Sequence, residues 1–268
     1  MSVSVLIGVN RCSVFNDWNA TQYHKLSDPQ TGWGLRVLER LKPLAGECIL
    51  DIGCGTGRLT SQIAARVQQS VTAVDRSRTM LSEASRHFGS WLLLAQADGT
   101  RLPFREMSFD AVFSTATFHW IKDHDMFFGE VYRVLKRGGR LVSQGGGGPN
   151  LQALYERARH LRSSGEYAPY FTDWSDPWNF AASEETTARM ANAGFVAIEV
   201  DLEPAQTPFD DIAAYEEFVT TVCLRHHIER LPEPLRYPFV HELALVAAAA
   251  DPPLTLDYWR LNVDGRRP

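Results

Sequence analysis

The sequence lacks several features that define other classes of protein. No two of its four cysteines form a CxxC pair; they are Cys12, Cys48, Cys54 and Cys223. This spacing predicts neither a disulfide framework nor a zinc site, and it fits a reducing cytoplasm. Excess basic charge is also missing, because 27 Lys and Arg stand against 32 Asp and Glu. Nucleic-acid binders concentrate positive charge on one surface, so we expect a small-molecule partner and no nucleic acid.

Long apolar runs are absent as well. The apolar stretch at 3–9 is too short for a signal-peptide core and has no basic segment before it. No other segment approaches the ~20 apolar residues of a membrane helix, so no membrane association is expected. The sequence has no internal repeats. Apolar residues make up 44% of the chain and charged residues 22%, so its 268 residues can build a proper globular core.

Between residues 47 and 145, short apolar runs alternate with helix-like stretches. The runs 49–52 and 71–74 are continuously apolar, as expected for strands that helices cover on both faces. The alternation therefore predicts βαβ units and a mainly parallel sheet. Ahead of it, apolar residues recur at helical spacing over 34–44, which predicts a helix packed on the sheet.

The second half of the chain is less regular. Four glycines at 145–148 followed by Pro149 predict a flexible turn and the end of the preceding strand. The aromatic stretch Tyr167–Phe180 is interpreted as a lid, with a loop pinned to the core by its large side chains as the alternative. The other elements expected are helices at 151–161 and 183–193 with Gly194 as the stop, a strand at 195–201, helices over 208–250 interrupted by Pro232, Pro234 and Pro238, and an extended run at 254–263.

A glycine-rich turn follows the first predicted strand, in the segment DIGCGTG that begins at Asp51. Gly53, Gly55 and Gly57 permit the close backbone approach that a nucleotide-like ligand needs. Dinucleotide-binding folds use a similar turn, but Arg58 stands where their fingerprint requires Gly or Ala. The Asp51 carboxylate would repel a pyrophosphate, whereas it suits a ligand with an ammonium and a sulfonium group. The turn therefore favours S-adenosylmethionine, which carries both.

Two further carboxylates end the next two predicted strands. Asp75 lies about eighteen residues beyond the glycine-rich turn, the usual place for a carboxylate that accepts ribose hydroxyls. Asp98, just before Gly99, is a candidate acceptor for the adenine amino group, with a simple turn acid as the alternative. Because the carboxyl ends of parallel strands share one edge of a sheet, the three sites together predict a cofactor pocket.

These motifs resemble those of class I S-adenosylmethionine-dependent methyltransferases over residues 18–145, in the order DIGCGTG, VDRS, ADGTRLPF, FDAVFSTATFHW and VLKRGGRLV. The resemblance implies a Rossmann-like sheet of seven strands, six of them parallel, with helices on both faces and 254–263 as the antiparallel last strand beside the fifth. It implies a methyltransferase domain over 31–268 with helical and aromatic cap elements around 150–182 and 208–250. The implied cofactor-binding residues are Asp51, Gly53, Cys54, Gly55, Gly57, Asp75, Arg76, Asp98, Gly99 and Thr115.

Within the class, FHWIKDH and WNATQYHKL resemble a small-molecule branch that includes the trans-aconitate methyltransferases. This likeness implies that residues 1–30 form an extension that covers the cofactor with Trp18 and Tyr23, beside the helix at 34–44. It also implies O-methylation of a carboxylate or hydroxyl by a cytoplasmic monomer or homodimer. The alternatives are C- or N-methylation in secondary or quinone metabolism, a catalytically silent cofactor-binding module, and a rearrangement promoted by the bound sulfonium.

The acceptor side is predicted from two residues. His119 follows the fourth predicted strand, where it either removes a proton from a hydroxyl or packs against Trp120 and bonds to the backbone. Arg260 lies in the last predicted strand, as a clamp on a substrate carboxylate or as the ion-pair partner of Asp257 or Glu199. The candidate catalytic residue is thus His119, and the candidate acceptor-binding residues are Trp120, Tyr170 and Arg260.

Other polar residues are assigned structural roles. Asp123 precedes a predicted helix at 124–135 and is a suitable N-cap for it. His226 and His227 are adjacent, so their side chains diverge on a helix and do not form a metal pair. No metal site is predicted.

Overall fold

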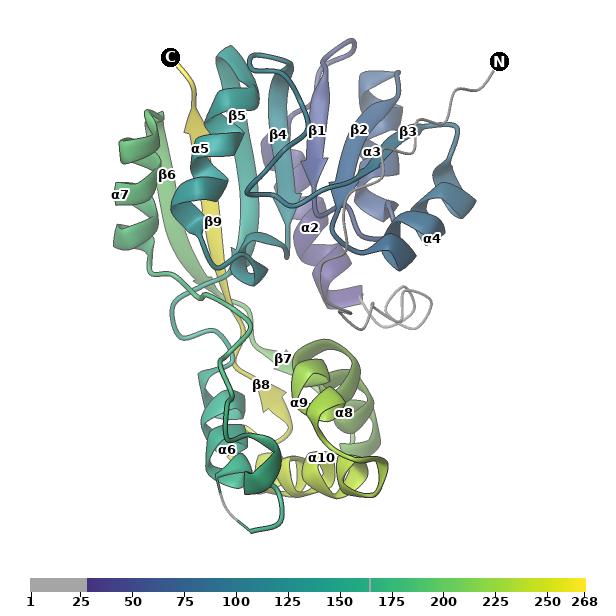
Figure 1. Cartoon of the computed structure of the whole chain (residues 1–268), viewed down its shortest axis with the longest axis vertical. Helices are drawn as coiled ribbons and strands as arrows, with labels where there is room; N and C mark the ends of the chain where they lie inside the picture. Colours follow the sequence, from purple (N-terminus) through teal and green to yellow (C-terminus); the bar gives the residue numbers. More distant parts are fainter. Residues whose placement is uncertain (1–27, 164) are drawn as a thin grey trace.

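The computed structural model describes residues 28–163 and 165–268. Among these residues, seven strands form one sheet in the order β3-β2-β1-β4-β5-β9-β6 (Figure 1). The strands are β1 (Ile49–Ile52), β2 (Val71–Asp75), β3 (Leu92–Gln96), β4 (Phe109–Thr115), β5 (Leu135–Gly146), β6 (Val196–Pro204) and β9 (Trp259–Arg266).

The directions of the strands follow from their pairing. β1 to β5 pair in parallel, whereas β9 runs antiparallel to both of its neighbours, β5 and β6. Six strands of the described sheet therefore share one direction and β9 opposes them. This confirms the Rossmann-like α/β class, including the antiparallel last strand inserted beside β5.

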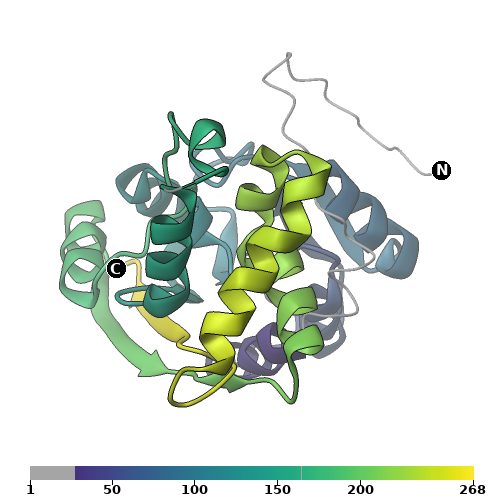
Figure 2. The same ribbon diagram turned by 90° about the horizontal axis from the view of Figure 1, so that it is seen from below.

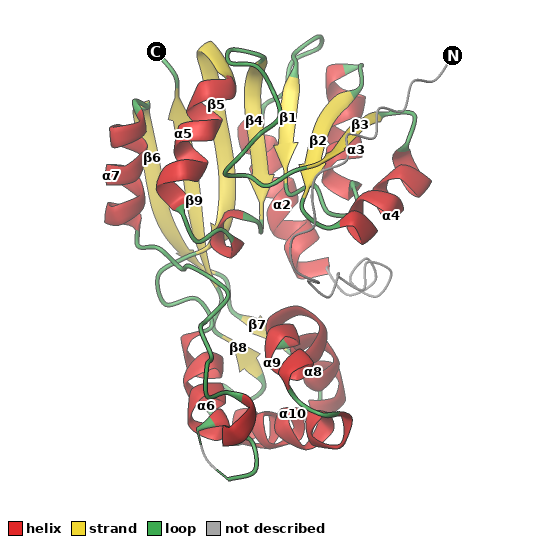
Figure 3. Ribbon diagram, viewed as in Figure 1, coloured by secondary structure: helices red, strands yellow, loops and turns green. Residues whose placement is uncertain are grey.

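Helices cover both faces of the sheet (Figure 3). On one face, apolar side chains of α2 (Asp28–Leu41) and α3 (Arg58–Val67) share a core with β1 and β4. On the other, α5 (His124–Val134) and α7 (Ser183–Ala193) pack with β4 and β9. α4 (Arg78–Phe88) packs along β2 and β3. Covered faces explain why the inner strands are continuously apolar.

A second group of helices lies below the sheet, and we call it the helical lobe. It contains α6 (Gln152–Arg162), α8 (Ile212–Phe218), α9 (Arg225–Arg230) and α10 (Glu233–Ala248), together with a two-stranded ribbon of β7 (Thr207–Pro208) and β8 (Thr255–Leu256). Figure 2 shows these helices from below. These elements include the two segments for which a cap is predicted, whereas the division of the chain into domains stays a prediction.

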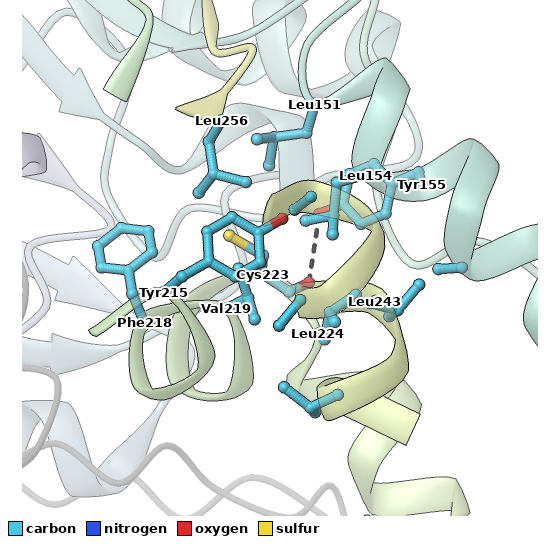
Figure 4. Close-up of a cluster of buried hydrophobic side chains, with 14 of the residues drawn as sticks. Leu151, Leu154, Tyr155, Tyr215, Phe218, Val219, Cys223, Leu224, Leu243 and Leu256 are labelled. Carbon is cyan, nitrogen blue, oxygen red and sulfur yellow. Dashed lines mark hydrogen bonds between the residues drawn. The ribbon is translucent and has the colours of Figure 1, made fainter. Parts of the chain in front are cut away.

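The helical lobe has its own core. Tyr155, Tyr215 and Leu243 come from three of its helices and are buried together, and the Tyr155 hydroxyl donates to the Cys223 carbonyl at 3.2 Å (Figure 4). Trp33, from α2, belongs to the same cluster. α2 therefore connects the core of the helical lobe with the core under the sheet.

Several boundaries differ from the sequence prediction. The strand expected at 254–263 is two elements, because β8 pairs with β7 in the helical lobe and β9 begins only at Trp259. The helical region is interrupted at Pro232, as predicted, because Pro232 lies between α9 and α10 and is the N-cap of α10. The other two prolines do not interrupt it: Pro234 lies in the first turn of α10, where no N–H is needed, and Pro238 lies inside the helix. Tyr167 and Phe171 are buried in the helical lobe. Their burial agrees with the alternative in which large side chains pin this loop to the core, and not with a lid. The Asp123 cap and the Gly194 stop agree with their predictions.

The prediction of a turn over the four glycines is wrong for the first two, which belong to a strand. β5 continues through Gly145 and Gly146, which pair with Leu261 and Arg260 of β9. A Cβ at Gly145 would lie 2.7 Å from the Phe118 ring. The low strand propensity of glycine is offset here by pairing with β9 and by a contact that only glycine allows.

Candidate functional site

The glycine-rich turn joins β1 to α3 at the carboxyl edge of the sheet. Its three glycines all have positive φ, and at Gly53 a Cβ would lie 2.0 Å from Oγ1 of Thr117. At Gly55, φ is 56° and no described atom lies within 4 Å of a Cβ position. The turn is thus closely packed at Gly53 and open at Gly55, a backbone cradle into which a ligand can fit.

Asp51 lies beneath this turn and is 2% exposed. The Thr60 hydroxyl donates to its Oδ2 at 2.6 Å. Burial raises the pKa of Asp51 to about 7, since the charged carboxylate loses its hydration, and the nearby charge of Asp75 adds to the rise. A cationic ligand group beside Asp51 would favour the ionised form. The residues present therefore fit the ammonium and sulfonium of S-adenosylmethionine.

Asp75 ends β2 beside the same turn. Its Oδ2 accepts from the Gly55 backbone N–H and its Oδ1 from that of Ser77, both at 2.8 Å. Asp75 therefore joins the glycine-rich turn to the first turn of α4. Each carboxylate oxygen has two lone pairs and can accept more than one hydrogen bond, as a ribose-binding carboxylate must.

Asp98 lies after β3, with the geometry of a turn acid. Its Oδ1 accepts from the N–H and the hydroxyl of Thr100, at 2.9 and 2.8 Å. Gly99 lies under Ile121, whose Cδ1 would be 2.9 Å from an added Cβ. The structure places both residues at the predicted strand end, and a role for Asp98 toward adenine stays a prediction.

The remaining predicted cofactor residues are spread around this edge. Cys54 is half-buried in the glycine-rich turn, and its N–H donates to the Val74 carbonyl at 3.0 Å. Arg76 is exposed after β2, and Thr115 ends β4. The predicted residues Trp18 and Tyr23 lie outside the described residues.

His119 lies in a short 3₁₀ turn, η1 (Phe118–Trp120), just beyond β4. It is buried, and its Nδ1 accepts from the Gly146 N–H at 3.1 Å. Its ring centroid lies 5.1 Å from that of Trp120 and 5.7 Å from that of Phe180. Burial lowers its pKa well below the usual value, and the positive charge of Arg260 lowers it further. His119 is therefore neutral near pH 7 with its proton on Nε2, which matches the alternative in which it bonds to the backbone.

Arg260 lies in β9 and is 3% exposed. Its guanidinium carbon lies 4.6 Å from the centroid of the Trp33 ring, and its Nε donates to Oε1 of Gln144 at 3.4 Å. Among the described residues, neither Asp257 nor Glu199 forms an ion pair with Arg260, so the predicted partners are wrong. Asp257 precedes β9 and accepts from the Ala153 N–H, and Glu199 lies opposite Asp264 instead.

The other predicted acceptor residues differ in position. Trp120 is half-buried beside His119, and its ring lies 5.5 Å from that of His226. Tyr170 lies in η2 (Ala168–Tyr170) of the helical lobe and is 39% exposed. Sequence reasoning missed Trp33 and Gln144. No sequence signal marks Gln144, because β5 contains several other polar residues.

Phe180, whose ring contacts that of His119, lines a hollow of about 280 Å³ together with Asn150, Tyr155 and Trp178. Another hollow, of about 450 Å³, lies between α8 and α10. No group of three or more His, Cys, Asp or Glu suited to a metal occurs within the described parts of the chain. None of the helices described there is long and apolar enough to cross a membrane.

Comparison with known proteins connects this geometry to a family. A family model described as a methyltransferase domain matches residues 50–143. A malonyl-[acyl-carrier protein] O-methyltransferase of Geobacter sulfurreducens is 33% identical over 192 residues, which cover 67% of this chain and 69% of that relative. A trans-aconitate 2-methyltransferase of Delftia acidovorans is 25% identical over 264 residues, or 94% of each chain.

The fold has relatives among solved structures. Phosphoethanolamine N-methyltransferase 2 of Haemonchus contortus, solved in complex with S-adenosyl-L-methionine, superimposes with a TM-score of 0.60 at 20% identity. The match covers 93% of this chain and 56% of that chain, and it supports the fold alone. The chain belongs to the class I S-adenosylmethionine-dependent methyltransferases, resembles their trans-aconitate branch, and uses S-adenosylmethionine as its cofactor.

Proposed function

We propose that this methyltransferase is an O-methyltransferase of small carboxylic acids, with the acceptor carboxylate held between His119 and Arg260. The observation that carries the proposal is the bond from the Gly146 N–H to Nδ1 of His119. Because Nδ1 already accepts that hydrogen bond, the only ring nitrogen that the neutral His119 can present to the substrate is Nε2, which carries the proton and donates. Such a histidine donates a hydrogen bond to a carboxylate instead of taking a proton from a hydroxyl.

Arg260 supplies the positive charge for the same carboxylate. Gly146, whose N–H donates to His119, lies directly opposite Arg260 in the sheet, so the two groups belong to one region of the site. The Trp33 ring and Gln144 contact the guanidinium from α2 and β5 and restrict its orientation. An arginine can bind a carboxylate through two parallel N–H groups, a geometry that lysine lacks.

A carboxylate also removes the need for a base. Carboxylic acids ionise near pH 4, so at neutral pH no proton must leave before methyl transfer. An alcohol would need a base, and a histidine whose pKa lies well below its usual value is a weak one. The site therefore favours an acid over an alcohol as the acceptor.

The residues of the chain position the acceptor oxygens and exclude water from the site. When bound, the cofactor would supply an electrophilic methyl carbon, which an acceptor oxygen would attack in line as S-adenosylhomocysteine leaves. His119 and Arg260 hold the oxygens at fixed places, which raises the effective concentration of the nucleophile. The rings of Trp33, Trp120 and Phe180 surround these two residues and exclude water.

The names of two relatives support this acceptor class. Trans-aconitate is a carboxylate, and a malonyl group carries one. Both proteins are named as methyltransferases, and the malonyl-[acyl-carrier protein] enzyme is named as an O-methyltransferase.

The test is a product analysis with cofactor labelled in its methyl group. The purified full chain is incubated with di- and tricarboxylic acids and with matched alcohols, phenols and amines. We expect label in methyl esters of the acids, which mild alkali releases as methanol. Label that resists alkali, or transfer to alcohols or amines alone, would overturn the proposal. Cofactor binding without transfer to any acceptor would instead favour a silent binding module.

A further inference from the structure

We infer that Gln144 is a positioning residue, which aims the Arg260 guanidinium through a directed row of hydrogen bonds that starts at the surface carboxylates Asp201 and Glu203. The inference rests on the proposed function, in which Arg260 binds the acceptor carboxylate. It adds to that function a second set of residues, none of which touches the acceptor.

The row crosses three neighbouring strands. Asn262 of β9 lies opposite Asp201 of β6 on one side and Gln144 of β5 on the other. Asn262 donates through Nδ2 to Asp201 at 3.0 Å and to Glu203 at 3.4 Å. Gln144 then donates through Nε2 to Oδ1 of Asn262 at 2.7 Å, and Arg260 donates through Nε to Oε1 of Gln144 at 3.4 Å.

Each bond fixes the orientation of the next amide. Ionised carboxylates only accept, so Asp201 and Glu203 face the NH₂ group of Asn262. The amide oxygen of Asn262 must then face Gln144, where it accepts the Gln144 NH₂ group. This leaves the Gln144 oxygen, and not its nitrogen, facing the guanidinium.

Arg40, on helix α2, favours the same orientation of the Asn262 amide. Its guanidinium, on α2, donates to the same Oδ1 of Asn262 and also to the Ser143 carbonyl at 2.9 Å and the Asp264 carboxylate at 2.7 Å. A guanidinium can only donate, so it too requires the Asn262 oxygen to point inward. A reversed amide would place NH₂ groups against Arg40 and Arg260.

The position of Gln144 on the sheet explains why it reaches Arg260. Gly146 lies directly opposite Arg260 and has no side chain. Gln144, two residues earlier, presents its side chain on the same face of β5. Gln144 is 2% exposed and Asn262 is 8% exposed, so water competes little for these bonds.

The choice of an amide has a chemical consequence. A glutamine oxygen orients the guanidinium without adding a negative charge beside it. A glutamate at this place would orient it as well, but would neutralise it and compete with the acceptor carboxylate. A methionine keeps the length of the side chain and removes the polar contact.

The kinetic test compares Gln144→Met and Gln144→Glu with the wild-type enzyme on an acid that it methylates. We expect each to raise the KM of the acid about tenfold or more, the scale of a lost or neutralised charge-assisted hydrogen bond. The kcat and the Kd of the cofactor should stay within about twofold. A KM unchanged in both variants, with methyl esters still formed, would disprove the positioning role while the proposed function stands.

Ser143→Ala is the matched control. Ser143 is the adjacent, equally buried residue of β5, its side chain points to the other face, and its hydroxyl has no hydrogen-bond partner in the described parts of the chain. Its loss should leave the KM unchanged. An equal rise of KM in Ser143→Ala would mean that general disturbance of β5 explains the effect, and the inference would fail.

A second measurement needs no turnover. The Nε–H resonance of Arg260 is assigned in ¹⁵N-labelled protein by its disappearance in Arg260→Lys. We expect this resonance to shift and its hydrogen exchange to accelerate in Gln144→Met, with unchanged peaks for arginines far from β5. An identical resonance in Gln144→Met would overturn the inference, even where the wild-type enzyme methylates no acid and the proposed function has failed separately.

Discussion

The Gly146 N–H and the Nδ1 atom of His119 are 3.1 Å apart, and this bond connects the end of β5 to the turn after β4. Because glycine at this position has no side chain, the ring of Phe180 can approach the same backbone. The bond sets the tautomer of His119, so the predictions begin with that residue.

We expect His119→Ala to raise the KM of an acid acceptor and to change its kcat little, since the residue donates a hydrogen bond and moves no proton. His119→Gln should restore part of the loss, because its amide can accept from Gly146 and donate on the other side. Initial rates at varied acceptor concentration provide the test. A drop of kcat by about 10²-fold with an unchanged KM would indicate a general base instead.

The same histidine should affect stability at low pH. Its pKa in the folded protein lies well below 6.5, so the folded state keeps it neutral while the unfolded chain binds a proton at about 6.5. Stability is therefore fully present above about pH 6.5 and falls as the pH decreases toward the folded pKa. We expect urea unfolding of His119→Gln to show a smaller fall between pH 7 and 5 than the wild-type protein. Equal slopes would contradict this, and the comparison cancels the contributions of the other histidines.

Asp51 should make cofactor binding depend on pH. With a pKa of about 7, the carboxyl is partly protonated in the free protein, and a cationic ligand group would favour its ionised form. We expect affinity for S-adenosylmethionine to rise as the pH increases from 5.5 to 7.5, with protons released on binding below pH 7. Calorimetry in two buffers of different ionisation enthalpy measures that release. Asp51→Asn should bind with no such pH dependence, and a wild-type affinity that is flat over this range would refute the prediction.

Asp75→Ala should weaken S-adenosylmethionine binding by roughly 1.5–3 kcal/mol, the scale of lost hydrogen bonds to a charged group. The loss combines any bonds to ribose hydroxyls with the loosening of the glycine-rich turn, because Asp75 accepts from Gly55. Calorimetry with circular dichroism as the fold control decides. Unchanged affinity in a folded Asp75→Ala protein would remove the ribose assignment.

Arg260→Lys tests the clamp directly. Lysine keeps the charge but cannot bind a carboxylate through two parallel N–H groups. We expect the KM of an acid acceptor to rise about tenfold or more, while the Kd of the cofactor and the Tm hold. A lower Tm with normal kinetics would show that Arg260 serves the packing of β9 alone.

Much of the fold and the cofactor edge was accessible from sequence because the signals are local. A strand, a glycine-rich turn and a helix start follow one another between Ile49 and Arg58, and Asp75 ends the next strand. Sequence patterns of this kind need no knowledge of distant partners. The seven-stranded topology then followed from the resemblance to a family.

The environment of Arg260 was not accessible in this way. Its contacts Trp33 and Gln144 are more than a hundred residues away in sequence, and the register between β6 and β9 decides that Glu203, not Glu199, lies opposite it. Residue types alone do not encode such a register. Gly145 shows the same limit, because its strand conformation depends on Phe118 and β9 and not on glycine's own preference.

The position of Trp33 has a consequence for the exchange of ligands. Its ring is part of the core of the helical lobe, forms an edge contact with Tyr258 at 5.0 Å, and lies over Arg260 of the sheet. Any motion that separates the lobe from the sheet must therefore hydrate this indole and withdraw it from the guanidinium. The same contact therefore opposes both product release and local unfolding of the helical lobe. Substitution of Trp33 by a smaller residue should speed product release and also the hydrogen exchange of backbone amides in α10.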